Sequence, residues 1–244
     1  MKKGVYGLFM LLNISYKYLM KKNVFHKIIW YIVIFSLIGL FIEIMMGFLS
    51  TDNRRGCILG PLCVIYGICA TVLIFSLQNF KNSIVKIFIW GAAEGTLMQF
   101  LISFAFEAAF GIRFWNYTNM GNVNGRICIA YAASWGAISI VLVEIASKIL
   151  DKAIDKIQGR KKVIIDTILT ILIVAETLFT VWGIYVYKAR AKMVYNDVVI
   201  FEEKNAIGKL GDKIFTNEIM KKVFPNIRFL DEEKNEVWIK ELMK

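Results

Sequence analysis

The sequence predicts an all-α protein: a polytopic bundle of about five transmembrane helices, with a short N-terminal interfacial helix and a small soluble C-terminal tail. Hydrophobic residues make up 57% of the 244-residue chain, and its mean hydropathy is +0.56. A soluble domain of this size has a largely polar exterior, which leaves no place for so much apolar surface. The apolar residues are also gathered into long runs, as a bilayer requires.

Five apolar runs are each long enough to cross a hydrocarbon core of about 30 Å, because an α-helix rises about 1.5 Å per residue. They are His26–Ser50, Cys57–Gln78, Val85–Phe110, Ile127–Leu150 and Val163–Tyr187. Few charged residues interrupt them. Together they define a transmembrane domain over residues 26–188 and predict a multi-pass protein of the cell membrane.

The two ends of the chain have a different character. Residues 1–25 contain a shorter apolar stretch, Val5–Met20, which Asn13 and Lys17 interrupt and which lacks the cleavage site of a secretory signal. We interpret it as an amphipathic interfacial segment, with a sixth span as the alternative. Residues 189–244 carry mixed charges and too few apolar residues for a core of their own, so this soluble tail is expected to pack on the membrane domain.

The net charge of +11 arises from lysines and arginines that flank the apolar runs. They precede the first run, lie between the second and third at Lys81 and Lys86, and fill the segment Lys148–Lys162. With five spans these three regions share one side, which the positive-inside rule makes cytoplasmic. The Gly111–Arg126 loop and the tail then face outward. Basic residues in such places contact anionic headgroups, so membrane lipids are expected partners and nucleic acid is not.

The potential metal ligands and nucleophiles show no functional spacing. There are four cysteines and one histidine: Cys57, Cys63, Cys69, Cys128 and His26. We interpret the cysteines as small buried apolar residues, and no metal ion or cofactor is expected.

Carboxylates inside spans are the first candidates for a function, because a charge at mid-helix costs about 2.5–3.5 kcal/mol on insertion scales. The glutamates there are Glu43, Glu94, Glu107, Glu144 and Glu176. Glu144 has Lys148 four residues later, which predicts a structural ion pair. Glu94 lies between Gly91 and Gly95, a small-xxx-small pattern that lets another helix approach closely. It is either a proton or cation site or a hydrogen-bonding partner of that helix.

Glu43 and Glu107 approach the outer ends of their spans, where two turns supply arginines. These are Arg54, Arg55, Arg113 and Arg126. Carboxylate and guanidinium groups pair in a low-dielectric setting. The pairs either form a recognition site or only lock helix ends together, and the sequence leaves the two interpretations equally open.

The same turns carry a series of motifs in a fixed order. They are Gly39 to Glu43, Arg55-Gly56, Gly60-Pro61-Leu62-Cys63, Ile65-Tyr66-Gly67, Glu94, Glu107, Arg113, Trp115, Tyr117, Asn122, Gly125-Arg126-Ile127 and Trp135-Gly136. Over roughly residues 30–145 this series resembles the ABC-transporter type IV family, also called CmpB-like permeases. Two positions depart from the family pattern. Val64 replaces a proline, which is expected to leave the second span straighter, and Asn116 replaces an aspartate, which removes a negative charge.

The resemblance implies the membrane subunit of an ABC-type transporter. The sequence contains no Gly-x-x-x-x-Gly-Lys-Ser/Thr phosphate loop, so a separate ATPase subunit would dock on the cytoplasmic face, at 79–86 and 149–162. The candidate substrate-binding residues lie mainly on the opposite face: Glu43, Arg55, Tyr66, Glu94, Glu107, Arg113, Trp115, Asn116 and Arg126. Arginines outnumber carboxylates in the outer cluster, which favours an anionic solute or lipid headgroup.

Two other classes stay open. The same arginines would suit a lipid- or partner-binding membrane protein without turnover, and a homo-oligomer is left open as well. An intramembrane enzyme, with Glu43 and Glu107 as acid and base or Cys63 as nucleophile, is less favoured because no activating histidine or metal motif accompanies them. We therefore expect no enzymatic activity.

Overall fold

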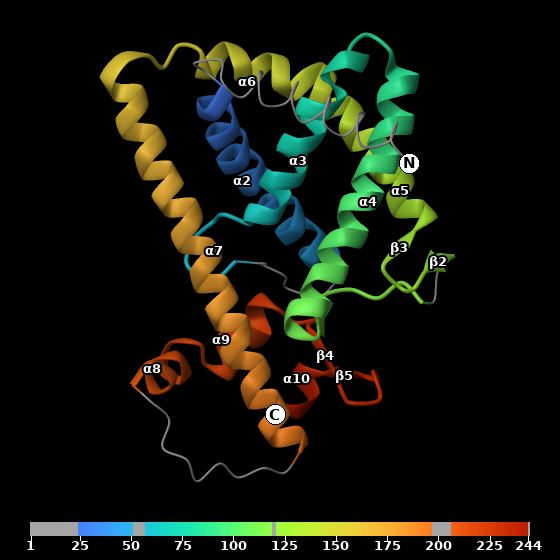
Figure 1. Cartoon of the computed structure of the whole chain (residues 1–244), viewed down its shortest axis with the longest axis vertical. Coiled ribbons are helices and arrows are strands. Elements are labelled where there is room, and N and C mark those ends of the chain that lie inside the picture. The colour runs from blue at the N-terminus through green and yellow to red at the C-terminus, as the bar shows by residue number, and fades with distance from the viewer. Residues whose placement is uncertain (1–23, 51–56, 119–120, 197–205, 244) are drawn as a thin grey trace, which may run out of the picture.

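The computed structural model describes residues 24–50, 57–118, 121–196 and 206–243, and it is mostly helical (Figure 1). The bundle contains α2 (Val24–Ser50), α3 (Val64–Leu77), α4 (Ile84–Phe110), α5 (Ile129–Ile140), α6 (Ser147–Ile154) and α7 (Gly159–Tyr195). Within the described residues, four segments are long and apolar enough to cross a membrane: Val24–Met45, Ile84–Phe110, Ile129–Ile154 and Gly159–Tyr195. The predicted interfacial segment 1–25 lies almost wholly outside the described residues.

The second expected span is not one long helix. Residues Cys57–Cys63 are non-helical, α3 begins at Val64, and after Leu77 one 3₁₀ turn, η1 (Gln78–Phe80), ends it. Pro61 explains the late start, since its ring disfavours helix at the residue before it and it has no N–H to donate. The expectation that Val64 straightens this span is also wrong. Val64 is the first residue of α3, where a proline is tolerated without a bend.

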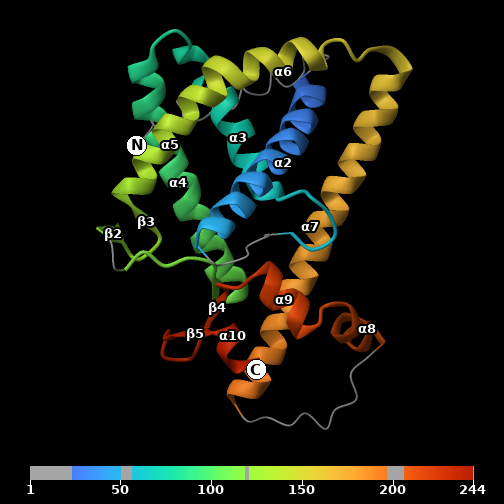
Figure 2. The same cartoon turned by 180° about the vertical axis from the view of Figure 1, so that it is seen from behind.

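The bundle has two ends of different composition. At the basic end, the start of α2, the turn after α3 and α6 meet, as Figures 1 and 2 show. Lys27 pairs with Asp151 at 2.9 Å, and the backbone N–H of Asn82 donates to Glu144 at 2.8 Å. Glu144 also makes the expected pair with Lys148, at 2.7 Å. The described parts of the three basic regions, which include Lys27, therefore share one side, as the sequence predicts.

The fourth expected span continues past Leu150 to Ile154 and changes direction on the way. A π-helical turn, η2 (Val141–Ala146), separates α5 from α6. Such a turn inserts an extra residue and is a known cause of bends. Figure 2 shows the result, since α5 runs beside α4 and α6 lies across the basic end above α2 and α3.

Glycines set how closely the helices pack. A side chain on Gly95 would lie 2.5 Å from Trp135 of α5, and one on Gly91 would clash with Ser139 of the same helix. The predicted small-xxx-small contact is therefore confirmed, with α5 as the partner of α4. Gly67 plays the same part in α3, because a Cβ there would clash with the carbonyl oxygen of Ile32 in α2.

The tail end holds the Gly111–Arg126 loop and the C-terminal segment. That segment contains α8 (Ala206–Ile214), α9 (Asn217–Val223), β4 (Arg228–Leu230), β5 (Glu236–Trp238) and α10 (Ile239–Leu242). Strand β1 (Ile112–Arg113) pairs antiparallel with β4, which pairs with β5, so loop and tail share one small sheet. A second hairpin joins β2 (Asn122–Val123) to β3 (Ile127–Cys128).

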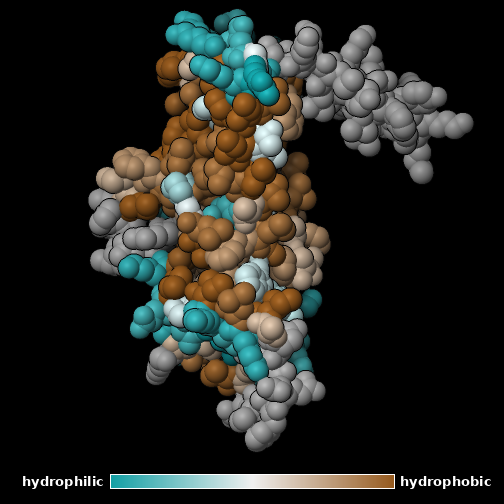
Figure 3. All heavy atoms as spheres, turned by 90° about the vertical axis from the view of Figure 1, so that its left-hand side faces the viewer, coloured by the Kyte–Doolittle hydropathy of each residue, from teal (hydrophilic) through white to brown (hydrophobic). Residues whose placement is uncertain are grey.

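The tail packs on the bundle, as its composition predicts. Ile112 and Tyr187 are buried in one core with Phe215, Met220 and Phe229 of the tail. Helix α7 runs without a break to Tyr195, so the expected domain boundary at residue 188 falls inside it. In Figure 3 an apolar belt covers the face that includes α7, with hydrophilic residues gathered above and below it.

The glycine contacts give a first testable prediction. Gly67→Ala should destabilise the protein by about 1–3 kcal/mol, because the added methyl group pushes α3 away from α2. Thermal unfolding in detergent measures the effect. The control is Gly121→Ala, since nothing lies within 4 Å of a Cβ at that position. Equal melting temperatures for the two variants would contradict the close α2–α3 contact.

Candidate functional site

One face of α4 carries polar groups toward the tail end. Every fourth residue on this face is buried, beginning with Ile87 and the two glycines that contact α5, and continuing with Gln99 and Ser103. Glu107 stands at the next position. Four-residue steps stay on one side of a helix, so these groups form a line that faces α5 and the following loop.

Glu107 joins both arginines of the loop. Its Oε2 atom accepts hydrogen bonds from Arg113 Nε and Arg126 Nη2, each at 2.6 Å. Arg126 also donates from Nη1 to Ser103 Oγ at 3.0 Å, and only 6% of its surface is exposed. Its guanidinium carbon lies 5.7 and 5.8 Å from the ring centres of Phe100 and Phe104. Arg126 is therefore a desolvated cation that needs the Glu107 carboxylate.

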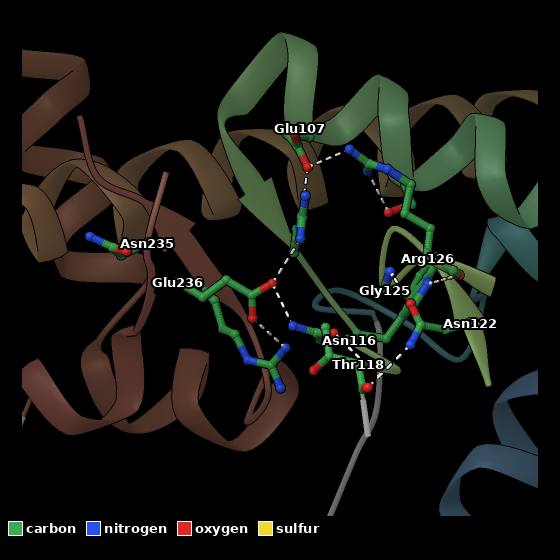
Figure 4. Close-up of polar contacts among 12 residues, drawn as sticks. Glu107, Asn116, Thr118, Asn122, Gly125, Arg126, Asn235 and Glu236 are labelled. Carbon is green, nitrogen blue, oxygen red and sulfur yellow. Dashed lines mark hydrogen bonds and ion pairs between the residues drawn. The ribbon is translucent and has the colours of Figure 1, made fainter. Parts of the chain in front are cut away.

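The tail completes this network through Glu236. Its Oε1 atom accepts from Arg113 Nη1 at 2.9 Å and from Asn116 Nδ2 at 2.7 Å, and its Oε2 atom accepts from Arg228 Nη1 at 3.0 Å (Figure 4). Arg113 and Arg228 are direct partners across β1 and β4, where like charges repel. Glu236 lies between them and offsets that repulsion.

The electrostatic environment differs between these two arginines. Burial opposes the charge of Arg113, but the hydrogen bonds and charges of Glu107 and Glu236 outweigh it and raise the pKa of the guanidinium. At Arg228, burial is the largest effect and lowers the pKa, although Glu236 opposes it. The Trp238 ring lies 3.8 Å from the Arg228 guanidinium carbon and covers it. Arg228 thus depends more than Arg113 on contacts within the tail.

The loop backbone holds the polar side chains in place. Trp115 Nε1 donates to the Arg126 carbonyl at 2.9 Å, and Asn116 Oδ1 accepts from the Thr118 N–H at 2.9 Å. Gly125 has a φ of 70°, and a Cβ there would lie 2.6 Å from Asn116 Oδ1. The glycine is therefore required both by its backbone and by the position of Asn116.

The remaining predicted site residues lie elsewhere or outside the description. Arg55 falls in 51–56, outside the described residues. Glu94 accepts a hydrogen bond from Ser76 of α3, farther along α4 from the network. Tyr66 packs against Gly39 of α2. Glu43 lies within electrostatic range of Cys63, beside the non-helical Cys57–Cys63 segment.

That segment has an anchor on α7, Glu176. The carboxylate is 5% exposed, and its Oε1 atom accepts from the N–H groups of Ile58 at 3.0 Å and Leu59 at 3.4 Å. The Thr180 hydroxyl contacts the same oxygen at 3.1 Å. Non-helical backbone at membrane depth needs such partners, because lipid offers none. Glu176, for which the sequence shows no partner, thus holds the segment that precedes α3.

Sequence reasoning missed several members of these sites. Gln99 and Ser103 had a signal, namely their four-residue steps between Gly95 and Glu107. Glu236 and Arg228 had no comparable signal, because their role depends on pairing between segments more than 100 residues apart. The described residues contain no group of three or more His, Cys, Asp or Glu that could hold a metal ion, and the four cysteines are buried and form no disulfide.

The comparison with known families agrees with this arrangement of motifs. A family model described as "Putative ABC-transporter type IV" matches residues 30–181, more than half of the chain. The chain belongs to this family. No curated protein and no solved structure matches it.

The match to the type IV family divides the network into two parts. Glu107, Arg113 and Arg126 lie within residues 30–181, whereas Arg228 and Glu236 lie beyond them. Asn116, where the resemblance to the family leads us to expect an aspartate, donates to Glu236. An aspartate at this position would place two carboxylates against each other, so the departure suits the tail of this chain.

This contact predicts the effect of Asn116→Asp. The isosteric change should loosen the tail and lower the free energy of unfolding by about 1–3 kcal/mol, because the Glu236 carboxylate loses a donor and faces a like charge. Limited proteolysis of the tail and thermal unfolding measure it. Adding Glu236→Gln to Asn116→Asp should restore much of the loss, since one carboxylate again faces Arg113 and Arg228. A double variant no more stable than Asn116→Asp alone would contradict the contact.

The anchor of the Cys57–Cys63 segment gives another prediction. Glu176→Ala removes the acceptor of the Ile58 and Leu59 N–H groups and should lower the free energy of unfolding by about 1–3 kcal/mol for each group that water cannot reach. Glu176→Gln keeps one side-chain oxygen as an acceptor and should lower the free energy of unfolding by less than Glu176→Ala does. Thermal unfolding ranks the variants, and labelling of Cys57 and Cys63, both buried, reports whether the segment opens. Slower or unchanged labelling in Glu176→Ala would argue against the anchor.

Proposed function

We propose that this chain is the membrane subunit of an ABC-type transporter and that a separate ATPase binds its basic end. The observation that carries the proposal is the position of α6. This helix lies across the basic end of a family member whose sequence has no phosphate loop of its own. By the positive-inside rule the basic end faces the cytoplasm, where ATP is available.

The outer face of α6 suits a protein partner. Lys148, Ile149, Lys152 and Ala153 are exposed, and Ile149 is 63% exposed. The acidic residues of this region are used within the chain, because Lys27 pairs with Asp151 at 2.9 Å and with Asp155 at 3.4 Å. The exposed face is therefore basic with an apolar centre, which matches a partner surface that carries carboxylates around an apolar pocket.

The ties of α6 to the bundle support a role in transmitting motion. The His26 ring is 2% exposed and bridges two helices, with Nδ1 at 2.7 Å from Asp166 Oδ1 of α7 and Nε2 at 3.1 Å from the Ile154 carbonyl of α6. Through η2, α6 continues into α5, which packs on the glycines of α4. A movement of α6 would be transmitted through these rigid contacts to the polar face of α4.

At the tail end, we propose that the arginine network recognises an anionic group. Three arginines meet two carboxylates there, which leaves one positive charge in excess. All three arginines already bond within the chain, so an anion would have to displace a carboxylate, and Glu236 is the one carried by the tail. Recognition would then be coupled to release of the tail.

The same internal bonding favours a second candidate, a lipid- or partner-binding protein without turnover. In that case the network only locks the loop and tail to α4, and function rests on binding alone. Arg113→Ala would then reduce bound lipid or partner without a defect in flux. Neither proposal includes a catalytic step.

The test is a gentle purification of the tagged chain from its own membranes, with mass spectrometry of the proteins that accompany it. A stoichiometric ATPase is expected. Ile149→Asp together with Lys152→Glu should abolish its recovery, because a charge enters the apolar centre and a basic contact is reversed. The control, Lys234→Glu, makes the same reversal on the β4–β5 turn at the tail end and should leave recovery unchanged.

Two results would overturn the transporter proposal. One is a chain that purifies without any ATPase. The other is an ATPase whose recovery is the same with and without the α6 substitutions, which would place its binding site elsewhere.

A further inference from the structure

Helix α7 is longer than a membrane span, and its charges mark where the span begins. The helix has 37 residues, which corresponds to about 55 Å, whereas the hydrocarbon core measures about 30 Å. Arg160, Lys161 and Lys162 occupy its first turn. From Val163, about 20 residues cross the core and reach Trp182.

The features of α7 near Trp182 are those of a membrane interface. Leu178 is 66% exposed and Tyr185, seven residues on, is 62% exposed on the same side of the helix. Between Lys162 and Lys188 the charged residues are Asp166 and Glu176, and both are buried. Along α7, exposed aliphatic residues are thus followed by Trp182 and Tyr185 and then by Lys188, which is the order found at the edge of a bilayer.

Helix α8 lies against this level of α7. A Cβ on Gly211 would be 2.9 Å from Val186 and 3.4 Å from the Trp182 ring. The Phe215 ring, just after α8, packs on Trp182 with 5.0 Å between ring centres. Figures 1 and 2 show α8 projecting sideways from α7, on the side away from α4 and α5. Its depth is therefore fixed at the edge of the apolar span.

The exposed surface of α8 is amphipathic. Ile207 is 65% and Leu210 is 50% exposed, and they lie three residues apart on one side of the helix. Lys213 is exposed three residues after Leu210, next to it on the helix surface. Apolar side chains beside a lysine, at the depth of the headgroups, are the features of a helix that lies in the membrane surface.

We propose that α8 is an interfacial helix that inserts Ile207 and Leu210 among the acyl chains of the leaflet at the tail end. Lys213 then reaches the phosphates of anionic headgroups. The lipid surface fits better than a protein partner, because α8 packs on α7 at the level of Trp182, where the apolar span of α7 ends. The contact fixes the tail, and with it Glu236, beside the bilayer.

The experiment uses the full chain in vesicles of phosphatidylcholine and phosphatidylglycerol. An environment-sensitive fluorophore is attached to cysteine in Leu210→Cys, and as a control in Glu233→Cys on the exposed β4–β5 turn. The four native cysteines are buried, and labelling of the unaltered chain gives the background. Nitroxide lipids with the spin label near the headgroup should quench position 210 at least about twofold more than position 233.

Three further outcomes decide the proposal. Lys213→Glu, added to Leu210→Cys, should reduce quenching only in vesicles that contain phosphatidylglycerol, which supports the headgroup contact. Equal quenching at positions 210 and 233 would place α8 in water and overturn the proposal. An apolar emission spectrum at position 210 without quenching by nitroxide lipids would show that protein covers α8, either another copy of the chain or a partner, and would also overturn it.

Discussion

Lipid hydrocarbon offers no hydrogen bonds, so polar groups inside the bundle depend on partners supplied by the chain itself. This constraint accounts for the long-range contacts that hold the helices in place. Glu176 of α7 accepts from the backbone before α3. Glu107 of α4 accepts from two arginines of the following loop. Buried charges are costly individually, and in Glu107 and Glu176 the fold uses this cost to fix two segments at once.

The spacing on α4 shows how one helix can combine close packing with polar bonding. Its first half uses Gly91 and Gly95 to admit α5, and its second half uses Gln99 and Ser103 on the same face. Gln99 accepts from Trp135 Nε1 at 3.0 Å and donates to the Tyr117 hydroxyl at 3.2 Å, so it links α5 to the loop. Burial raises the pKa of the Tyr117 hydroxyl, which keeps this group a neutral partner. The helix is thus tied along its whole length to the segments that follow it.

The sequence predicted those features that depend on local composition. Long apolar runs predicted the helical bundle, flanking lysines predicted which ends lie together, and Gly91 and Gly95 predicted a helix contact. It failed where the outcome depends on distant segments. The late start of α3 follows from Pro61, but nothing near Pro61 shows that Glu176, more than 100 residues away, would satisfy the non-helical backbone. Glu107, Arg113 and Arg126 were expected to meet, whereas Glu236 joins them only because β4 pairs with β1.

Asn116 and Glu236 are best understood as one feature of this chain. The network already contains the like-charged pair Arg113 and Arg228, held together by the single Glu236 carboxylate. A second carboxylate at position 116 would compete with Glu236 for the same arginines and repel it at hydrogen-bonding distance. An amide there instead donates to Glu236 and, through its oxygen, fixes Thr118. The tail lies beyond the part of the chain that the family model matches, and the residue at position 116 is one of its contacts with the loop. A family member with aspartate at this position would need a different group where Glu236 stands here.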